Sequence, residues 1–419
     1  MTNSIYPKSN LKILGQVFKF ERMKKGYSLR GIARSENVAP TLVSEIETGK
    51  IFPNVETLER LFSHVDINLI TDLDFLTDKY EQLELYNEAM YYGDRVRMND
   101  IFKLLYQKHH ELFYSLIYID YMFSYITYQS SYNGNYSLEE IDKLEVFYDY
   151  FSEQQKQRFN LIKGVNLFKT NQVAEAVRYL EANQFLHGNQ KAYAINLSYL
   201  AFSYERQFRI HNCILQASRA SRLHGEHANL RRKLAADLVL VKNLTEVGRF
   251  DEAVSTLNNL ELSIQHDDMD TKHFFNHLRF LRSYTYYRQK KYEQALKELD
   301  LYEISDLYFH FYKANILNRL NRNDEAVSVL KASLQLSEIK SHYLFSRLNK
   351  LFMYFITKKY DNDEFETLYI ELSNKPEAIY EFNIYRIIQI MALEYYEHNK
   401  LFDKALKVAK DYMKESKFL

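Results

Sequence analysis

The sequence has few residues that interrupt a helix. Among 419 residues there are four prolines, with none between Pro53 and Pro376, and ten glycines, with none after Gly248. Proline breaks helix interiors and glycine disfavours them by about 1 kcal/mol. β-Sheets need turn residues that this chain barely has. We therefore expect an all-α fold in which one helix follows another.

Cysteine and long apolar runs are also scarce. The single cysteine, Cys213, excludes an internal disulfide framework and fits a reducing cytoplasm, and we expect a buried side chain rather than a nucleophile. No apolar run approaches the roughly 20 residues that cross a bilayer. Lys8, Lys12 and Lys19 interrupt any signal-peptide core. These absences favour a soluble cytoplasmic protein with no membrane partner.

Signatures of catalysis and of cofactor binding are missing from the sequence. The thirteen histidines show no metal-ligand spacing; His109 and His110, for example, are adjacent and point to different sides of a helix. No phosphate-binding glycine loop, dinucleotide fingerprint or Ser/His/Asp order stands out. We expect no cofactor, no metal and no enzymatic activity.

Charge is balanced overall, at 55 basic and 55 acidic residues, but not locally. Residues 1–34 hold eight lysines and arginines against one acid, Glu21. Such an excess suits a phosphate-facing patch, although a solvated basic helix face would look the same.

The first 66 residues predict a compact group of short helices. A helix ends at Gly26, and Ser28 is a good N-cap for a second one. A third helix begins at Pro40 and ends at Gly49, and Asn54 caps a fourth. Two short helices joined by a tight turn are typical of a helix-turn-helix.

This segment resembles the XRE/Cro class of lambda-repressor-like domains over about 55 residues. The resemblance rests on Leu14, Gly15, Arg22, Gly26, Ser28, Ile32, Ala33, Val38, Val43, Ser44, Glu45, Ile46, Glu47, Gly49, Lys50, Pro53 and Glu56. It implies that the third helix enters the major groove of double-stranded DNA and that Arg22 forms a structural salt bridge with Glu47. It places Pro40, Thr41, Ser44 and Glu45 toward base edges, and Ser28, Arg30, Lys50 and Asn54 near phosphates.

The segment departs from that class at three points. Leu29 stands where glutamine is frequent, Pro40 replaces a polar residue, and residues 40–48 contain no arginine or lysine. Bidentate recognition of guanine by arginine is therefore not expected, and specificity would depend on Thr41, Ser44 and DNA shape. A relic that no longer binds DNA is the alternative.

A different pattern recurs in the rest of the chain. Short segments centred on a small or apolar residue repeat every 31 to 42 residues, which predicts a solenoid of helix pairs. The centres are Ile101, Ile141, Ala176, Cys213, Ala253, Ala295, Ala326, Phe365 and Ala405. In several copies a second small residue lies twelve positions earlier: Gly164, Ala201, Ser283 and Ala314. The segment resembles degenerate tetratricopeptide repeats over residues 81–419, with 67–80 as a linker helix.

Stacked helix pairs expose a concave surface made by the first helix of each pair. Positions 18, 15, 11 and 8 before each centre share one face of that helix, and they mix aromatic, cationic and amide side chains, Arg158 among them. Asparagines recur in the same helices, and an asparagine ladder suits the backbone of an extended peptide. The expected peptide site comprises Asn196, Phe202, Lys242, Asn243, Asn276, His277, Phe280, Tyr284, Tyr308, Phe311, Asn315, Arg347, Asn349 and Tyr354.

The order of the two parts resembles the RRNPP group of quorum-sensing regulators, the Rap, Rgg, NprR, PlcR and PrgX types. The resemblance implies a homodimeric transcription factor that binds two-fold-related DNA half-sites and is switched by a short signalling peptide. Two alternatives stay open. The repeats would instead hold a response regulator or assist its dephosphorylation, or they would serve only for dimerisation.

Overall fold

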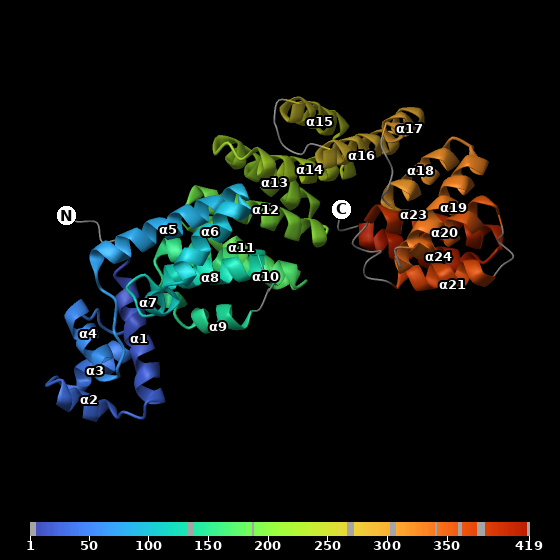
Figure 1. Ribbon diagram of the computed structural model, residues 1–419. Helices are drawn as coiled ribbons and strands as arrows, with labels where there is room; N and C mark the ends of the chain where they lie inside the picture. The colour runs from blue at the N-terminus through green and yellow to red at the C-terminus, as the bar shows by residue number, and fades with distance from the viewer. Residues whose placement is uncertain are drawn as a thin grey trace. The chain divides into compact units, whose positions relative to one another are not determined.

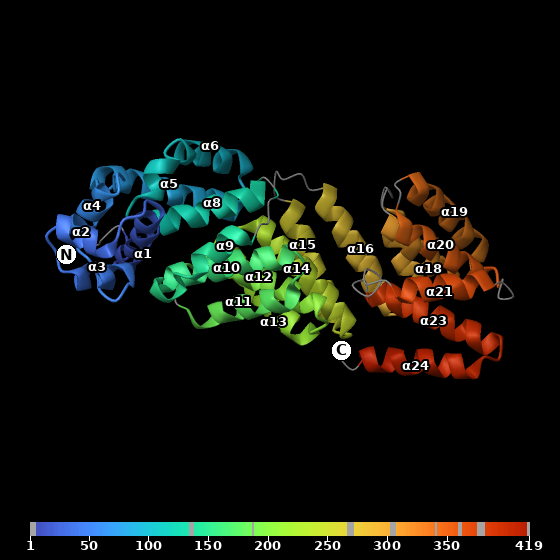
Figure 2. The same ribbon diagram turned by 90° about the horizontal axis from the view of Figure 1, so that it is seen from below.

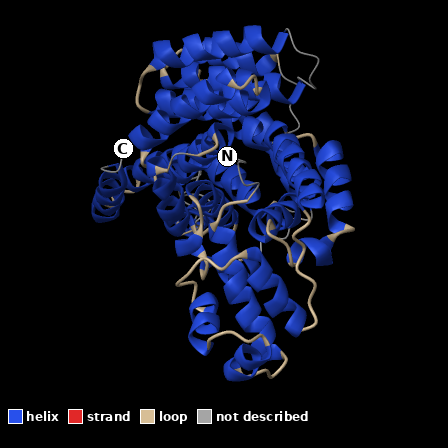
Figure 3. Cartoon of the chain, turned by 90° about the vertical axis from the view of Figure 1, so that its left-hand side faces the viewer, coloured by secondary structure: helices blue, strands red, loops and turns tan. Residues whose placement is uncertain are grey.

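A computed structural model describes residues 6–132, 134, 138–186, 188–265, 272–301, 307–339, 342–358, 363–374 and 382–416. Regular structure in these ranges is helical (Figures 1 and 3), apart from one isolated β-bridge between Ile70 and Ser115. The all-α expectation is thus confirmed for the described residues. The chain forms two compact units, Met1–Ser203 with Arg219–Lys233, and Tyr204–Ser218 with Leu234–Leu419.

The helices follow one another closely along the chain. The first half contains α1 (Ser9–Lys24), α2 (Leu29–Ser35), α3 (Pro40–Glu47), α4 (Val55–His64), α5 (Leu73–Tyr92), α6 (Arg95–Tyr106), α7 (His109–Phe113), α8 (Tyr118–Tyr132), α9 (Glu139–Glu145), η1 (Tyr148–Tyr150), α10 (Glu153–Lys169), α11 (Val173–Ala182), η2 (Asn183–Phe185) and α12 (Gln190–Arg206). The second half contains α13 (Ile210–Glu226), α14 (Leu230–Glu246), α15 (Phe250–Gln265), α16 (Lys272–Arg288), α17 (Tyr292–Asp300), α18 (Leu307–Arg319), α19 (Asn323–Ile339), α20 (Tyr343–Ile356), α21 (Asp363–Ser373), α23 (Phe382–His398) and α24 (Phe402–Ser416).

Helices α2, α3 and α4 begin where the sequence predicts. The Ser28 hydroxyl accepts the Gly31 N–H at 3.0 Å and caps α2, and the Asn54 side chain accepts the Thr57 N–H at 2.7 Å and caps α4. Pro40 occupies the first turn of α3. Because each cap satisfies a backbone donor that a helix start leaves open, Ser28 and Asn54 fix the starts of α2 and α4, while the restricted backbone of Pro40 suits the start of α3.

The repeat centres are buried, as the pattern requires. Ala176, Ala253, Ala295 and Ala326 are fully buried, each in the second helix of a pair. The earlier small residues permit close packing: the Ser283 hydroxyl donates to the Ala295 carbonyl at 2.7 Å. In the second compact unit α18, α19, α20 and α21 pack in succession (Figure 2). The sequence period therefore reports real helix pairs.

Several turns between helices adopt a left-handed backbone without glycine. Lys290, between α16 and α17, has φ +63°, and Phe208, Ala228 and Lys400 are similar. Non-glycine residues are disfavoured in this region by about 1 kcal/mol, so Lys290→Gly is expected to raise the free energy of unfolding by roughly that amount. The matched change Lys297→Gly, inside α17, should lower it by about 1 kcal/mol. Urea unfolding of both variants measures these changes in the free energy of unfolding. If both variants changed it in the same direction, this account would be contradicted.

Candidate functional site

The residues expected to face DNA lie on the surface of the α1–α4 region. Ser28, Arg30, Pro40, Thr41, Glu45, Lys50 and Asn54 are exposed, and Ser44 is half-buried. They occupy the N-terminal ends of α2 and α4, one face of α3 and the turn after it. A helix N-terminus presents open N–H groups that suit a phosphate oxygen. The exposed side chains are accessible to a partner, while the Ser28 and Asn54 oxygens each also accept one backbone N–H of their own helix.

A buried ion pair joins α1 to α3 behind that surface. Arg22 Nε lies 2.5 Å from Glu47 Oε1, and a second guanidinium nitrogen donates to Glu47 Oε2 at 2.9 Å. A third bond runs from Arg22 to the Tyr27 carbonyl at 2.6 Å. The pairing expected from the sequence is confirmed, and both side chains serve the fold rather than the surface.

The end of α3 rests against a tyrosine from the segment before α10. The Tyr150 hydroxyl donates to the Thr48 carbonyl at 3.2 Å, and its ring covers Gly49. Lys12 lies 4.1 Å from the centre of the Phe52 ring and 5.9 Å from that of Tyr150. The α1–α4 region is therefore held against residues that the sequence assigns to the repeats.

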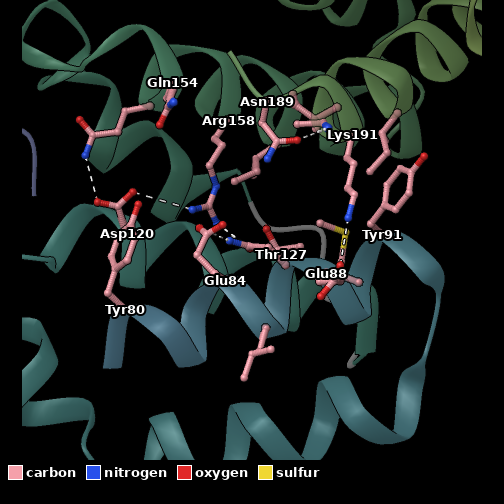
Figure 4. A pocket seen from close by; sticks show the side chains of 18 of the residues that line it. Tyr80, Glu84, Glu88, Tyr91, Asp120, Thr127, Gln154, Arg158, Asn189 and Lys191 are labelled. Carbon is pink, nitrogen blue, oxygen red and sulfur yellow. Dashed lines mark hydrogen bonds and ion pairs between the residues drawn. The ribbon is translucent and has the colours of Figure 1, made fainter. Parts of the chain in front are cut away.

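The first compact unit also contains a cavity of about 680 Å³. Its walls are formed mainly by α5, α8, α10 and α12 (Figure 4), and Pro7 also lines it. A volume of this size is typical of ligand pockets. The charged side chains that line it are Glu81, Glu84, Glu88, Asp120, Arg158 and Lys191.

A chain of polar contacts runs from this cavity to α1. Arg158 lies 3.8 Å from Asp120 and donates to Asn87 at 2.9 Å and to Ser124 at 3.2 Å. The Gln155 amide donates to Asp120 at 3.1 Å and to the Asn10 side chain at 2.9 Å. Asn10, in the first turn of α1, also donates to the Leu116 carbonyl at 2.8 Å.

Burial sets the electrostatics of the cavity. It raises the pKa of Asp120, because desolvation outweighs the lowering by Arg158 and by the bonds from Gln155. Burial also raises the pKa of Tyr80 to about 12, with a further contribution from Asp120. At the other end, a hydrogen bond from Lys191 at 3.0 Å lowers the pKa of Glu88.

The raised pKa of Asp120 makes the stability of the protein depend on pH. Its folded-state pKa lies above the ordinary value of 3.8. The contribution of Asp120 to the free energy of unfolding is therefore largest below pH 3.8 and declines as pH rises through the raised pKa. The difference in unfolding free energy between the wild type and Asp120→Asn should therefore fall as pH rises. Hydrogen exchange of α8 amides in urea, followed from acid to neutral pH, measures it. A difference that is constant or grows with pH would contradict the raised pKa.

Three residues of the expected peptide site meet in the second compact unit. Phe280 lies between Tyr284 and Tyr308, with ring centres 6.4 Å and 5.5 Å away, and all three pack on Tyr312. The Tyr284 hydroxyl bonds to Glu246. These aromatic side chains form one cluster between α16 and α18.

The expectation of an exposed asparagine ladder is wrong for four of its members. Asn196, Asn243, Asn315 and Asn349 are buried, and their amides bond within the protein. Asn196 donates to the Leu180 carbonyl at 3.0 Å, and Asn349 to the Ser333 hydroxyl at 2.9 Å. Buried amides need such partners, so these bonds occupy groups that a ligand would use. Phe311 and Tyr284 are likewise buried.

The other expected residues retain surface. His277 is exposed, whereas the remainder are half-buried: Phe202, Lys242, Asn276, Phe280, Tyr308, Arg347 and Tyr354. Lys242 lies 3.3 Å from Glu205, and Arg347 lies 3.4 Å from Glu371. They belong to different helices, and some use their charge in ion pairs of the fold.

Metal sites, a reactive cysteine and membrane-spanning helices were also considered for the described residues. There, no three histidine, cysteine, aspartate or glutamate side chains gather closely enough to hold a metal ion. Cys213 is buried, as expected, and burial raises the pKa of its thiol far above the ordinary range, which disfavours the nucleophilic thiolate. Among the described helices, none combines the length and apolarity needed to span a membrane.

Solved structures share this architecture at low sequence identity. A Rap protein complexed with Competence and Sporulation Factor superposes with a TM-score of 0.63 and 10% identity, over 82% of this chain and 98% of that one. The apo form of the quorum sensor NprR from B. thuringiensis gives 0.61 and 19%, over 81% and 98%. The chain has the fold of the Rap and NprR proteins.

NprR in complex with its cognate peptide NprX is also similar, with a TM-score of 0.57 and 18% identity over 80% of this chain and 99% of that one. No protein-family model matches the chain, and no curated protein matches it by sequence. At these identities the likeness concerns the fold alone. The tetratricopeptide-like architecture expected from the repeats is confirmed.

Sequence reasoning missed most of the cavity. Arg158 was expected on the concave face, but Glu84, Asp120, Gln155 and Lys191 were not singled out. One signal was present: Asp120 is the lone charge in the otherwise apolar stretch from Leu116 to Phe123. A carboxylate in a buried run needs partners, and here they are Gln155 and Arg158.

Proposed function

We propose that this protein is a cytoplasmic transcriptional regulator of the RRNPP type, which binds DNA as a homodimer and responds to a short peptide. The observation that carries the proposal is the fold shared with NprR and Rap, both of which have been seen in complex with a signalling molecule. The α1–α4 region supplies the DNA-binding part and the helix pairs supply the receptor.

The surface of the α1–α4 region supports the first half of this function. Exposed polar residues occupy the ends of α2 and α4, where backbone N–H groups and the cations Arg30 and Lys50 suit phosphate. Thr41 and Ser44 on α3 are short enough to approach base edges closely. Two such regions in a homodimer would contact two-fold-related half-sites.

The receptor half is supported by two places in the repeats. One is the cavity of about 680 Å³ beside α5 and α10. The other is the aromatic cluster of Phe280 and Tyr308, near which Asn276 and His277 also have surface. Peptide binding in either place would change the packing of neighbouring helices and so shift the DNA-binding population.

Thr41→Glu tests the DNA-binding surface. A carboxylate on the exposed face of α3 would repel phosphates, so affinity for duplexes selected by the wild type from a randomised pool should fall at least about tenfold. Ser63→Glu, at an exposed position outside the proposed face, is the matched control. Fluorescence anisotropy with labelled duplex gives both affinities, and equal losses in the two variants would sink the assignment of α3.

The peptide response needs its own experiment. Peptides encoded next to the gene are titrated into the full-length protein by calorimetry, and duplex affinity is remeasured in their presence. Binding with a change in DNA affinity supports the proposal. If no such peptide binds, the receptor role is refuted while the DNA-binding role stands.

A further inference from the structure

The carboxylate of Glu45 lies where the charge of its own helix disfavours it. Glu45 belongs to the last turn of α3, whose open carbonyl groups carry partial negative charge, and this fully described helix has no basic residue in that turn. The other acid of the turn, Glu47, is buried against Arg22. Glu45 is exposed, and its side chain forms no hydrogen bond or ion pair with a described residue. The fold therefore gains nothing from a carboxylate at this position.

The other carboxylates between residues 9 and 64 have partners or a favourable place in a helix. Those with partners accept a hydrogen bond or lie beside a basic side chain: Glu21, Glu36, Glu47 and Glu59. Glu56 lies in the first turn of α4, where the partial positive charge of a helix N-terminus stabilises it. A residue that breaks a local rule without compensation is expected at a functional site rather than at a structural one. In the α1–α4 region Glu45 is that residue.

The face of α3 that carries Glu45 is otherwise neutral. Thr41 and Ser44 precede Glu45 by four positions and by one, so all three share one side of the helix. Thr48, three positions further on, donates its hydroxyl to the Ser44 carbonyl at 2.7 Å and so already has a partner. Because Glu47 is buried, Glu45 is the one charged side chain that α3 exposes. In a DNA complex of the kind proposed above, it would be the charge that α3 brings to the bases.

A carboxylate in the major groove can be satisfied by few groups. At neutral pH it accepts hydrogen bonds and donates none, and the surrounding phosphates repel it. Guanine and thymine present only acceptors in this groove, whereas cytosine and adenine each present an amino group. The adenine amino group lies beside N7, a second acceptor that repels a carboxylate, but the cytosine amino group lies beside a C–H. Cytosine is therefore the base that a carboxylate approaches with the least repulsion.

We propose that Glu45 recognises one cytosine in each DNA half-site by accepting a hydrogen bond from its N4 amino group. At any other base the carboxylate loses water and faces at least one acceptor, so the readout acts mainly by rejecting the wrong base. It gives α3 a base preference although the helix contains no arginine or lysine. The readout rests on the proposed function, because it requires the exposed face of α3 to enter the major groove.

Selection from a randomised duplex pool by the full-length protein tests this readout. One position of each selected half-site should be a cytosine, and its replacement by thymine should weaken wild-type binding at least about tenfold in fluorescence anisotropy. Glu45→Gln should remove most of that loss and shift the selected base to adenine, because an amide both donates and accepts. If the wild type tolerates thymine at every selected cytosine, or if Glu45→Gln selects the same bases as the wild type, the readout is refuted.

Glu56→Gln is the matched control, because it removes the same charge from an exposed position of α4. Both variants should bind unrelated duplexes more tightly than the wild type, since each loses a charge that phosphates repel. Only Glu45→Gln should change the selected base, and an equal change in both variants would reduce the effect to charge alone and refute base recognition. Because Glu45 opposes the charge of its helix end, its replacement should leave the protein at least as resistant to urea as the wild type.

The same selection separates this readout from the function on which it rests. If the wild type selects no sequence and binds no duplex, DNA binding is refuted and the readout with it. If the wild type binds specific sequences that Glu45→Gln also prefers, DNA binding stands and only the readout is refuted.

Discussion

Glu47→Ala is expected to destabilise the α1–α4 region by about 3–5 kcal/mol, because it leaves a buried guanidinium without its partner. The side chains of Arg22 and Glu47 are only 11% and 3% exposed. Two parallel bonds join them, and the Tyr27 carbonyl takes a third donor of Arg22. Removing the carboxylate exposes none of these donors to water, so the full desolvation penalty of the cation remains.

Native-state hydrogen exchange of α1 and α3 amides measures this loss region by region. The matched control is Glu139→Ala, which breaks an ion pair with Lys143. The side chains of Lys143 and Glu139 are 67% and 77% exposed. Water replaces a contact at such a surface, so no measurable change is expected there. If Glu47→Ala were as mild as the control, the pair would not be a structural element of this region.

The sequence predicted this pair through its resemblance to the XRE/Cro class, which implies a salt bridge between Arg22 and Glu47. The repeats, in contrast, were predictable from spacing. Small residues at the centre of each pair, such as Ala253 and Ala295, are required wherever two helices approach closely.

The asparagine prediction was wrong for a physical reason that a periodic pattern does not contain. The first helix of each pair has one side facing solvent and another facing the adjacent helices. Residues on either side recur with the same 3.6-residue period, so the period does not tell which side a residue is on. Asn196 and Asn349 lie on the packed side, where their amides bond to Leu180 and Ser333. An asparagine amide can form the same hydrogen bonds to a neighbouring helix as to a bound peptide.

The cavity lay beyond sequence reasoning because it combines residues from distant helices. Glu84, Asp120, Gln155 and Lys191 come from α5, α8, α10 and α12, far apart along the chain. Only Asp120 was conspicuous, as a charge within an apolar run. The contact of Asn10 with Gln155 joins residues 145 positions apart, and no local rule anticipates it.

Gly49→Ala is expected to lower the free energy of unfolding by about 2–4 kcal/mol, through two effects of comparable size. Gly49 has φ +65°, a conformation that an alanine adopts at a penalty. A Cβ there would also lie 2.9 Å from the Tyr150 ring, which must move away. Because that ring holds the end of α3, the clash also loosens the hold of residues 150–158 on the α1–α4 region.

Gly26→Ala separates the two effects. Gly26 has φ +76°, but a Cβ there meets no atom within 4 Å, so only the backbone penalty of about 1 kcal/mol should appear. Gly49→Ala in a Tyr150→Ala background should fall to about the same value, since the obstructing ring is gone. The coupling energy from this double-mutant cycle, measured by exchange of α3 amides, then isolates the Tyr150 contact. A coupling energy of zero would mean that the Tyr150 ring moves aside at no cost. Tyr150 would then not hold α3 against the segment that lines the cavity.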